Sequence, residues 1–301
     1  MLVSRTLCLF ALYLLGHGLQ AYANDSSVGD DNGGLLLTEQ ANIQMHSETL
    51  SLSETAVDVR YQFINTSAHA ITTDMAFPMP AMYFGMSDHN AITDFKLWVN
   101  DQPQTTQRRL VVLLAGHDIW PEWKRLGWSE NDMMSLMENG ESPAGKTALP
   151  PSWFDAQGMP RFTVHEYFTW QQHFPAKQAI QIRHHYIPSL STGVPQSATT
   201  LLESYGQSSC IDAAARKGIQ QREEEYGADW ALLRYILTTA NNWQGPIGEF
   251  HLIIKKRAPG DLLSLCFSGQ LQKTAADTFE YRAHDYTPPR DLEILFVRRP
   301  E

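Results

Sequence analysis

The chain has 301 residues, of which 43% are hydrophobic, and its formal net charge at pH 7 is −10. An acidic chain whose charges are mixed in sign lacks the basic patches that attract nucleic acids and anionic membrane surfaces, so we expect no nucleic-acid partner. The hydrophobic content is ordinary for a globular protein and argues against extensive disorder. The length allows one large β domain or two smaller ones.

The first 23 residues have the three parts of a secretory signal peptide. Arg5 gives a basic start, Leu7–Leu15 is an apolar run, and Ala21-Tyr22-Ala23 is a cleavage site with small residues. The run is shorter than the roughly 20 apolar residues that span a bilayer, and no comparable run follows, so we expect no membrane span. We therefore predict cleavage near Ala23/Asn24 and a periplasmic or extracellular protein.

Cleavage simplifies the cysteine content. Cys8 leaves with the signal peptide, and Cys210 and Cys266 remain. In an oxidising compartment such a pair forms a disulfide, which we predict here. The alternative, a redox-active pair, lacks the C-x-x-C spacing of such sites.

The segment after the signal peptide has the pattern of a β protein. Residues 24–34 are small, acidic and glycine-containing, and we expect a loose leader there; residues 35–115 then form the first part of a β-sandwich. Between Val57 and Phe63, apolar residues alternate with Asp58, Arg60 and Gln62, which predicts a strand with one buried and one exposed face. Further strands are expected at Ile71–Phe77, Phe95–Val99 and Arg109–Leu114.

Residues 116–160 differ from the flanking β pattern. Ser129 and Asp132 have the spacing of a capping box, and Asn139-Gly140 is a helix stop, which predicts a helix between them. A loop rich in proline, glycine and serine follows. We interpret the whole segment as a helical insertion or lid on a β scaffold.

Residues 161–301 return to β character and form the second part of the sandwich. We expect Phe162–Phe174 and Ala179–Tyr186 to pair as a hairpin around Pro175-Ala176-Lys177, and a short helix at Ile211–Tyr226 capped by Ser208 or Ser209. Five further strands are expected at Trp230–Thr238, Ile247–Lys255, Leu262–Phe267, Thr278–Tyr281 and Leu292–Val297. The predicted fold is all-β: one large or two packed antiparallel sandwiches with a helical insertion and one short extra helix.

Several motifs resemble a bacterial exported family known as domain of unknown function 4424, over essentially the whole mature chain. They include Val59–Ser67, Ala76–Pro80, His185–Pro188, Cys210–Asp212, Tyr235–Thr239, Asn242–Ile247 and Thr287–Leu292. More distantly, Phe63–Pro80 and Phe174–Tyr186 resemble the vault/inter-α-trypsin β-sandwich domain. The first resemblance implies a signal-bearing envelope or secreted β protein, and it supplies no catalytic residues; the second implies only the fold.

The first candidate binding surface is the aromatic insertion. It contains Trp120, Trp123, Trp128 and Trp153 in one non-β segment. Exposed aromatic side chains stack on sugars or anchor a protein partner, because they offer large area with few rotatable bonds. In the alternative interpretation, the tryptophans cap an open end of the sandwich and form core.

The second candidate site is polar. In the predicted hairpin, Glu166, Arg183 and His185 share one face, which is either a functional site or an exposed, hydrogen-bonded β surface. Adjacent residues of a strand point to opposite faces, so His184 and His185 cannot bind one ion. We expect no metal and no cofactor.

These observations favour an exported, non-catalytic accessory or binding protein of the bacterial envelope or secretome, with a protein or glycan partner. The alternatives are a secreted hydrolase acting on a glycan, peptide or lipid in a cleft beside the insertion, or a secreted effector that acts on a host molecule. We assign no catalytic residue, and the partner and the oligomeric state stay open.

Overall fold

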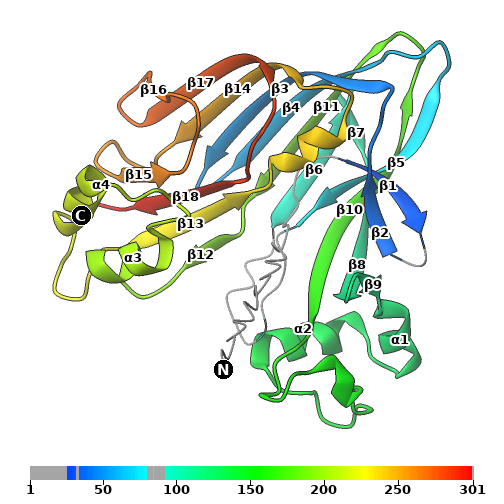
Figure 1. The fold of residues 1–301 in the computed structure, drawn as a ribbon, viewed down its shortest axis with the longest axis horizontal. Helices are drawn as coiled ribbons and strands as arrows, with labels where there is room; N and C mark the ends of the chain where they lie inside the picture. Colours follow the sequence, from blue (N-terminus) through cyan, green and yellow to red (C-terminus); the bar gives the residue numbers. More distant parts are fainter. Residues whose placement is uncertain (1–25, 32–33, 80–83, 85–91, 300–301) are drawn as a thin grey trace, which may run out of the picture.

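The computed structural model describes residues 26–31, 34–79, 84 and 92–299 (Figure 1). The predicted signal peptide and its cleavage site lie outside these residues. The described chain forms three β-sheets and four α-helices, which confirms the predicted all-β class with a helical insertion. No described helix is both long and apolar enough to span a bilayer.

The largest sheet has eight strands, all antiparallel to their neighbours except the parallel pair β14–β3. Its order is β16 (Gln272–Lys273), β17 (Thr278–Tyr286), β14 (Ile247–Lys255), β3 (Ile43–Ser53), β4 (Val57–Asn65), β11 (Ala179–Ile187), β6 (Thr93–Val99) and β7 (Gln102–Gln104). The alternation of apolar and polar residues in β4 places Val57, Val59, Tyr61 and Phe63 on the buried face, as the sequence predicts.

Two smaller sheets cover the buried face of the large one. The six-stranded sheet has the order β2 (Gly34–Thr38), β1 (Ser26–Asp31), β5 (Ile71–Pro78), β10 (Phe162–Phe174), β8 (Gln107–Leu114) and β9 (His117–Asp118). The four-stranded sheet has the order β12 (Leu190–Thr192), β13 (Trp230–Tyr235), β18 (Leu292–Val297) and β15 (Leu262–Leu265).

One hydrophobic core joins all three sheets. The ring of Phe77 in β5 lies 5.3 Å from that of His184 in β11, which connects the six-stranded and eight-stranded sheets. The hydroxyl groups of Tyr61 in β4 and Tyr235 in β13 are 3.3 Å apart, which connects the eight-stranded and four-stranded sheets. The molecule is therefore a pair of sandwiches that share the eight-stranded sheet.

The predicted hairpin of β10 and β11 is wrong. β10 pairs with β5 and β8 in the six-stranded sheet, whereas β11 pairs with β4 and β6 in the eight-stranded sheet. The chain crosses between the sheets at residues 175–178, with Lys177 in the left-handed region at φ 57°. Fully buried Asn65 fixes this crossing, because its Nδ2 donates to the carbonyl oxygens of Phe174 (2.9 Å) and His69 (2.8 Å).

Two smaller sequence expectations also need correction. The segment predicted as a loose leader contains β1, whose backbone pairs with β5 and β2. The predicted helix at residues 211–226 is shorter: α4 (Ala213–Gln220) is capped by Asp212, whose carboxylate accepts from the Ala215 amide at 2.7 Å. A further helix, α3 (Ala198–Tyr205), was not predicted; Ser197 caps it.

The predicted disulfide is confirmed. Cys210 and Cys266 are bonded, with their Cα atoms 4.8 Å apart. The bond connects the segment between α3 and α4 to the chain that follows β15. These helices lie at the end of the four-stranded sheet (Figure 1), so the disulfide holds them on that sheet.

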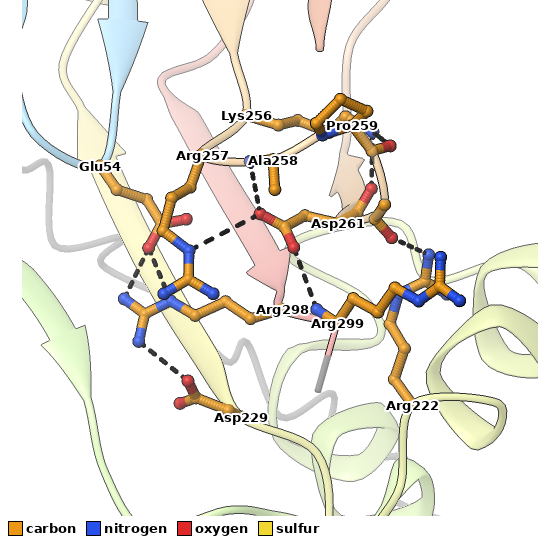
Figure 2. A network of polar contacts seen from close by, with 11 residues as sticks. Glu54, Arg222, Asp229, Lys256, Arg257, Ala258, Pro259, Asp261, Arg298 and Arg299 are labelled. Carbon is orange, nitrogen blue, oxygen red and sulfur yellow. Dashed lines mark hydrogen bonds and ion pairs between the residues drawn. The ribbon is translucent and has the colours of Figure 1, made fainter. Parts of the chain in front are cut away.

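A polar network also connects the large sheet to the four-stranded sheet (Figure 2). Arg298, just after β18, donates to Glu54 Oε2 at 2.6 and 2.9 Å and to Asp229 Oδ2 at 3.1 Å. Glu54 lies in the β3–β4 turn and is almost fully buried. Nearby, Lys256 donates to the carbonyl oxygen of Asp261 at 2.6 Å, and burial lowers the pKa of this ammonium group. Because these side chains bind one another and nearby carbonyl groups across two sheets, we regard this network as structural.

Candidate functional site

The four tryptophans of the insertion form its core. The insertion contains α1 (Trp120–Arg125), α2 (Glu130–Asn139) and a 3-10 helix at Pro151–Trp153. Trp123 is fully buried, and its ring centroid lies 5.1 Å from that of Trp128, 5.7 Å from that of Trp153 and 6.3 Å from that of Trp120. The other three tryptophans are also buried. Their ring faces are thus occupied by packing, as in the core interpretation, and a binding role for them stays a prediction.

The predicted polar site is not assembled as expected. Glu166 lies in β10 of the six-stranded sheet, where its buried carboxylate pairs with Arg108. Arg183 and His185 lie in β11 of the eight-stranded sheet, and His185 Nδ1 is 3.0 Å from Asp58 Oδ1. The error follows directly from the hairpin that the structure does not form. Arg183 and His185 do share one face, as predicted, and that face is the open side of the large sheet.

We call this open side the outer face: the side chains of β17, β14, β3, β4, β11 and β6 that point away from the core. Its residues are almost all polar, because each of these strands alternates buried apolar with exposed polar positions. Among the described helices, α1 packs on β8 and α4 on β15, so both lie away from this face (Figure 1).

One row of the outer face runs across four strands. The register places Thr49 opposite Arg60, Arg60 opposite Arg183, and Arg183 opposite Trp98. Directly opposite residues of antiparallel strands have Cβ atoms about 4.5–5.5 Å apart, so the four side chains are neighbours. The guanidinium carbon of Arg183 lies 3.9 Å from the centroid of the Trp98 ring, which is cation–π stacking distance.

A hollow of about 310 Å³ lies over this row. Its walls include Ser47, Thr49, Gln62, Gln181 and Asp101 beside the two arginines and Trp98. Among the described residues, neither Arg60 nor Arg183 has an ion-pair partner, and the buried Nε of Arg183 has no hydrogen-bond acceptor. The hollow therefore combines two arginines that lack an ion-pair partner among the described residues, one indole, several neutral hydrogen-bonding groups and the carboxylate of Asp101.

Three histidine–carboxylate pairs lie elsewhere on the outer face. Besides His185 and Asp58, His251 Nε2 lies 2.8 Å from Glu280 Oε2, and His284 Nδ1 lies 2.7 Å from Glu249 Oε1. The hydrogen bond from His251, followed by that from Thr274, lowers the pKa of Glu280. These acidic groups are thus partnered within the sheet, in contrast to the two arginines.

A second hollow, of about 550 Å³, lies beside the insertion, where the hydrolase alternative places a cleft. It is lined by Arg109, Asp118, Trp120, Lys124 and Glu130, among others. His185 is not part of it, and Glu166 is already paired with Arg108, so the acid–base pair suggested from the sequence is not brought together there. In the described part of the chain, no three His, Cys, Asp or Glu side chains form a group that could hold a metal ion.

Trp98 and Arg60 are among the site residues that sequence reasoning missed. Both lie in segments recognised as strands, but neither was selected. In Phe95–Val99 the core positions are Phe95, Leu97 and Val99, which places Trp98 on the polar side of the strand. A large aromatic residue on the polar side of an alternating strand is the signal that could have found this site.

Comparison with known proteins gives a family and only distant structural similarity. The family model described as domain of unknown function (DUF4424) matches residues 23–295. No curated protein matches the chain. A putative nutrient binding protein from Legionella pneumophila is 16% identical with a TM-score of 0.47, over 92% of this chain and 72% of that one. An M1 zinc metallopeptidase from Deinococcus radiodurans is 9% identical with a TM-score of 0.31, over 86% of this chain and 43% of the peptidase. At these values neither similarity carries a functional assignment.

Proposed function

The chain belongs to the DUF4424 family, and we propose that it is an exported, non-catalytic binding protein that holds a glycan on the outer face of the eight-stranded sheet. The observation that carries this proposal is the hollow above the row of Thr49, Arg60, Arg183 and Trp98. We place the protein in the bacterial envelope or secretome.

Two features support export. Residues 1–23 have the basic start, apolar run and small-residue site of a signal peptide. The Cys210–Cys266 disulfide fits an oxidising compartment, because cytosolic thiols are kept reduced.

The chemistry of the hollow favours a sugar over a protein partner. Gln62, Gln181, Ser47 and Thr49 offer both donors and acceptors for hydroxyl groups, and Trp98 adds an apolar wall. A protein interface buries about 800 Å² on each partner around an apolar centre. The outer face has no such centre, since the exposed large hydrophobic residues among those described are scattered: Met159, Ile187, Val194 and Tyr226.

A glycan-binding assay with matched variants tests the proposal. We expect the mature protein to be retained on a subset of immobilised glycans, and Trp98→Ala and Gln181→Ala to abolish retention. Arg282→Ala is the control: Arg282 is exposed on the same face, but in β17, four strand spacings of about 4.8 Å from β11. Retention of the Trp98→Ala protein equal to that of the wild type, or the absence of any glycan ligand, would contradict the proposal.

A further inference from the structure

We infer that the hollow on the outer face selects acidic sugars, with Arg60 and Arg183 together binding the carboxylate of a uronate. This inference rests on the proposed glycan-binding function and specifies its ligand class. It is carried by the position of the two arginines side by side in the hollow and by the absence of an ion pair to either of them among the described residues.

The two arginines lie next to each other although their like charges make this arrangement unfavourable. They are direct cross-strand partners on β4 and β11, where like charges repel each other. Other charged side chains of the outer face have a partner: Asp58 contacts His185, Glu249 contacts His284, Glu280 contacts His251 and Arg282, and Lys96 pairs with Asp94. Asp101 also lines the hollow but forms no ion pair with either arginine among the described residues. A bound anion would neutralise this pair.

Arg183 is already oriented for such a ligand. Its guanidinium carbon is 3.9 Å from the centre of the Trp98 ring, so the stack restricts the side chain, and the edge of the guanidinium remains for hydrogen bonding. Its Nε is buried and has no acceptor among the described residues. The terminal N–H groups of a guanidinium can donate two parallel hydrogen bonds to a planar carboxylate.

The neighbouring groups favour a sugar acid over a small inorganic anion. Gln62 and Gln181 are direct cross-strand partners in the next row, adjacent to the two arginines. Their amides match ring hydroxyl groups, whereas a phosphate or sulfate ion bound by the arginines alone would leave them unused. The geometry therefore points to a ligand with one carboxylate and several hydroxyl groups.

Calorimetry with paired ligands tests this inference. The probes are galacturonate, glucuronate and guluronate oligosaccharides, each with its neutral methyl ester. We expect at least one acid to bind about tenfold or more tightly than its ester, because hydrogen bonds to charged groups are stronger than neutral ones. Arg60→Gln and Arg183→Gln are expected to reduce this preference to less than about twofold, whereas Arg282→Gln leaves it unchanged. Arg183→Lys keeps the charge but loses the planar fork, and should lose most of the preference.

The possible failures are distinguishable. If neutral glycans or the esters bind as tightly as the acids, the acidic-sugar inference is wrong and the glycan-binding function stands. If no acid and no neutral glycan binds, both fail. If inorganic phosphate or sulfate alone displaces the sugar acid at equal concentration, the site is a small-anion site and the inference is overturned. Thermal melting of each variant shows that a lost preference does not come from unfolding.

Discussion

Trp123 in the insertion and Trp98 on the outer face represent two opposite uses of tryptophan in this molecule. Trp123 is enclosed by the rings of Trp120, Trp128, Trp153 and Phe162, with no exposed surface. Trp98 stands in a polar row beside Arg183 and contributes to the wall of a hollow. The tryptophans of the insertion bury one another, whereas Trp98, on the polar side of a strand, stacks with an arginine and lines a hollow.

The difference also separates stability from binding. The insertion has its own hydrophobic cluster, built from α1, α2 and the adjoining ends of β8 and β10. The side chains of the outer face contribute little to the hydrophobic core, which is formed by the opposite side of the same strands. Substitutions in the insertion should therefore lower the unfolding free energy, whereas substitutions on the outer face should mainly change ligand binding.

The largest expected effect is that of Trp123→Ala. Removing a fully buried tryptophan costs about 3–5 kcal/mol of unfolding free energy, because a cavity remains in the cluster. Urea unfolding followed by circular dichroism measures the loss. Trp98→Ala is the matched control, and we expect it to cost less than about 1 kcal/mol, since Trp98 is only partly buried. Equal losses for the two variants would remove the distinction between the regions.

The next effect concerns the disulfide, which lies away from the outer face. We expect the double variant Cys210→Ala/Cys266→Ala to lose about 2–4 kcal/mol of stability, because the unfolded chain is no longer cross-linked. Glycan binding should persist under conditions where the variant stays folded. A folded variant that no longer binds would show that the region of the disulfide beside the four-stranded sheet is coupled to the outer face.

The alternation in β4 shows what the sequence could predict about the fold. Apolar residues at 57, 59, 61 and 63 specify which side is buried, since the side chains of a strand alternate between its faces. The capping box at Ser129 and Asp132 likewise requires only local contacts, and it is present in α2. Both features are determined by residues close together in the chain.

Strand pairing and the site could not be predicted in the same way. A link of four residues between β10 and β11 suggests a hairpin, but Asn65, more than 100 residues upstream of Phe174, holds the link in a crossing between sheets. The row of Arg60, Arg183 and Trp98 comes from three strands distant in the sequence. Arg183 was selected from an incorrect pairing with Glu166, and Arg60 and Trp98 become its neighbours only through the register of β4, β11 and β6.

A smaller effect is expected in the insertion, where the contribution of Asp132 to stability depends on pH. Hydrogen bonds from Lys146 and Ser129 lower the pKa of Asp132 to about 2 from its ordinary 3.8. A carboxyl group with a lower pKa in the folded state stabilises the protein above its unfolded pKa, and this contribution is lost as the pH falls through the folded value. We expect Asp132→Asn to lower Tm at neutral pH, and the difference from wild type to shrink as the pH falls from about 4 towards 2. Ser129→Ala removes the helix cap, which costs about 1 kcal/mol of stability, and its Tm should be lower than that of the wild type across the same pH range. If the Tm difference between Asp132→Asn and the wild type stayed the same from about pH 4 to about pH 2, the effect would come from packing and not from the charge of Asp132.

The smallest expected effect has the opposite sign. Because Arg60 and Arg183 repel each other across β4 and β11, Arg60→Gln should raise the unfolding free energy by about 0.2–0.5 kcal/mol at low ionic strength. Salt screens this repulsion, so the gain should fall as ionic strength increases. Arg282→Gln is the control: Arg282 lies 3.2 Å from Glu280, and removing it should slightly lower stability instead. A stabilised Arg60→Gln protein that loses its preference for acidic sugars would show that the two cations are kept for the ligand, at the expense of the fold. A destabilised one would mean that Arg60 already has a partner in the free protein, and the two cations would then contribute to the fold, as the packed tryptophans of the insertion do.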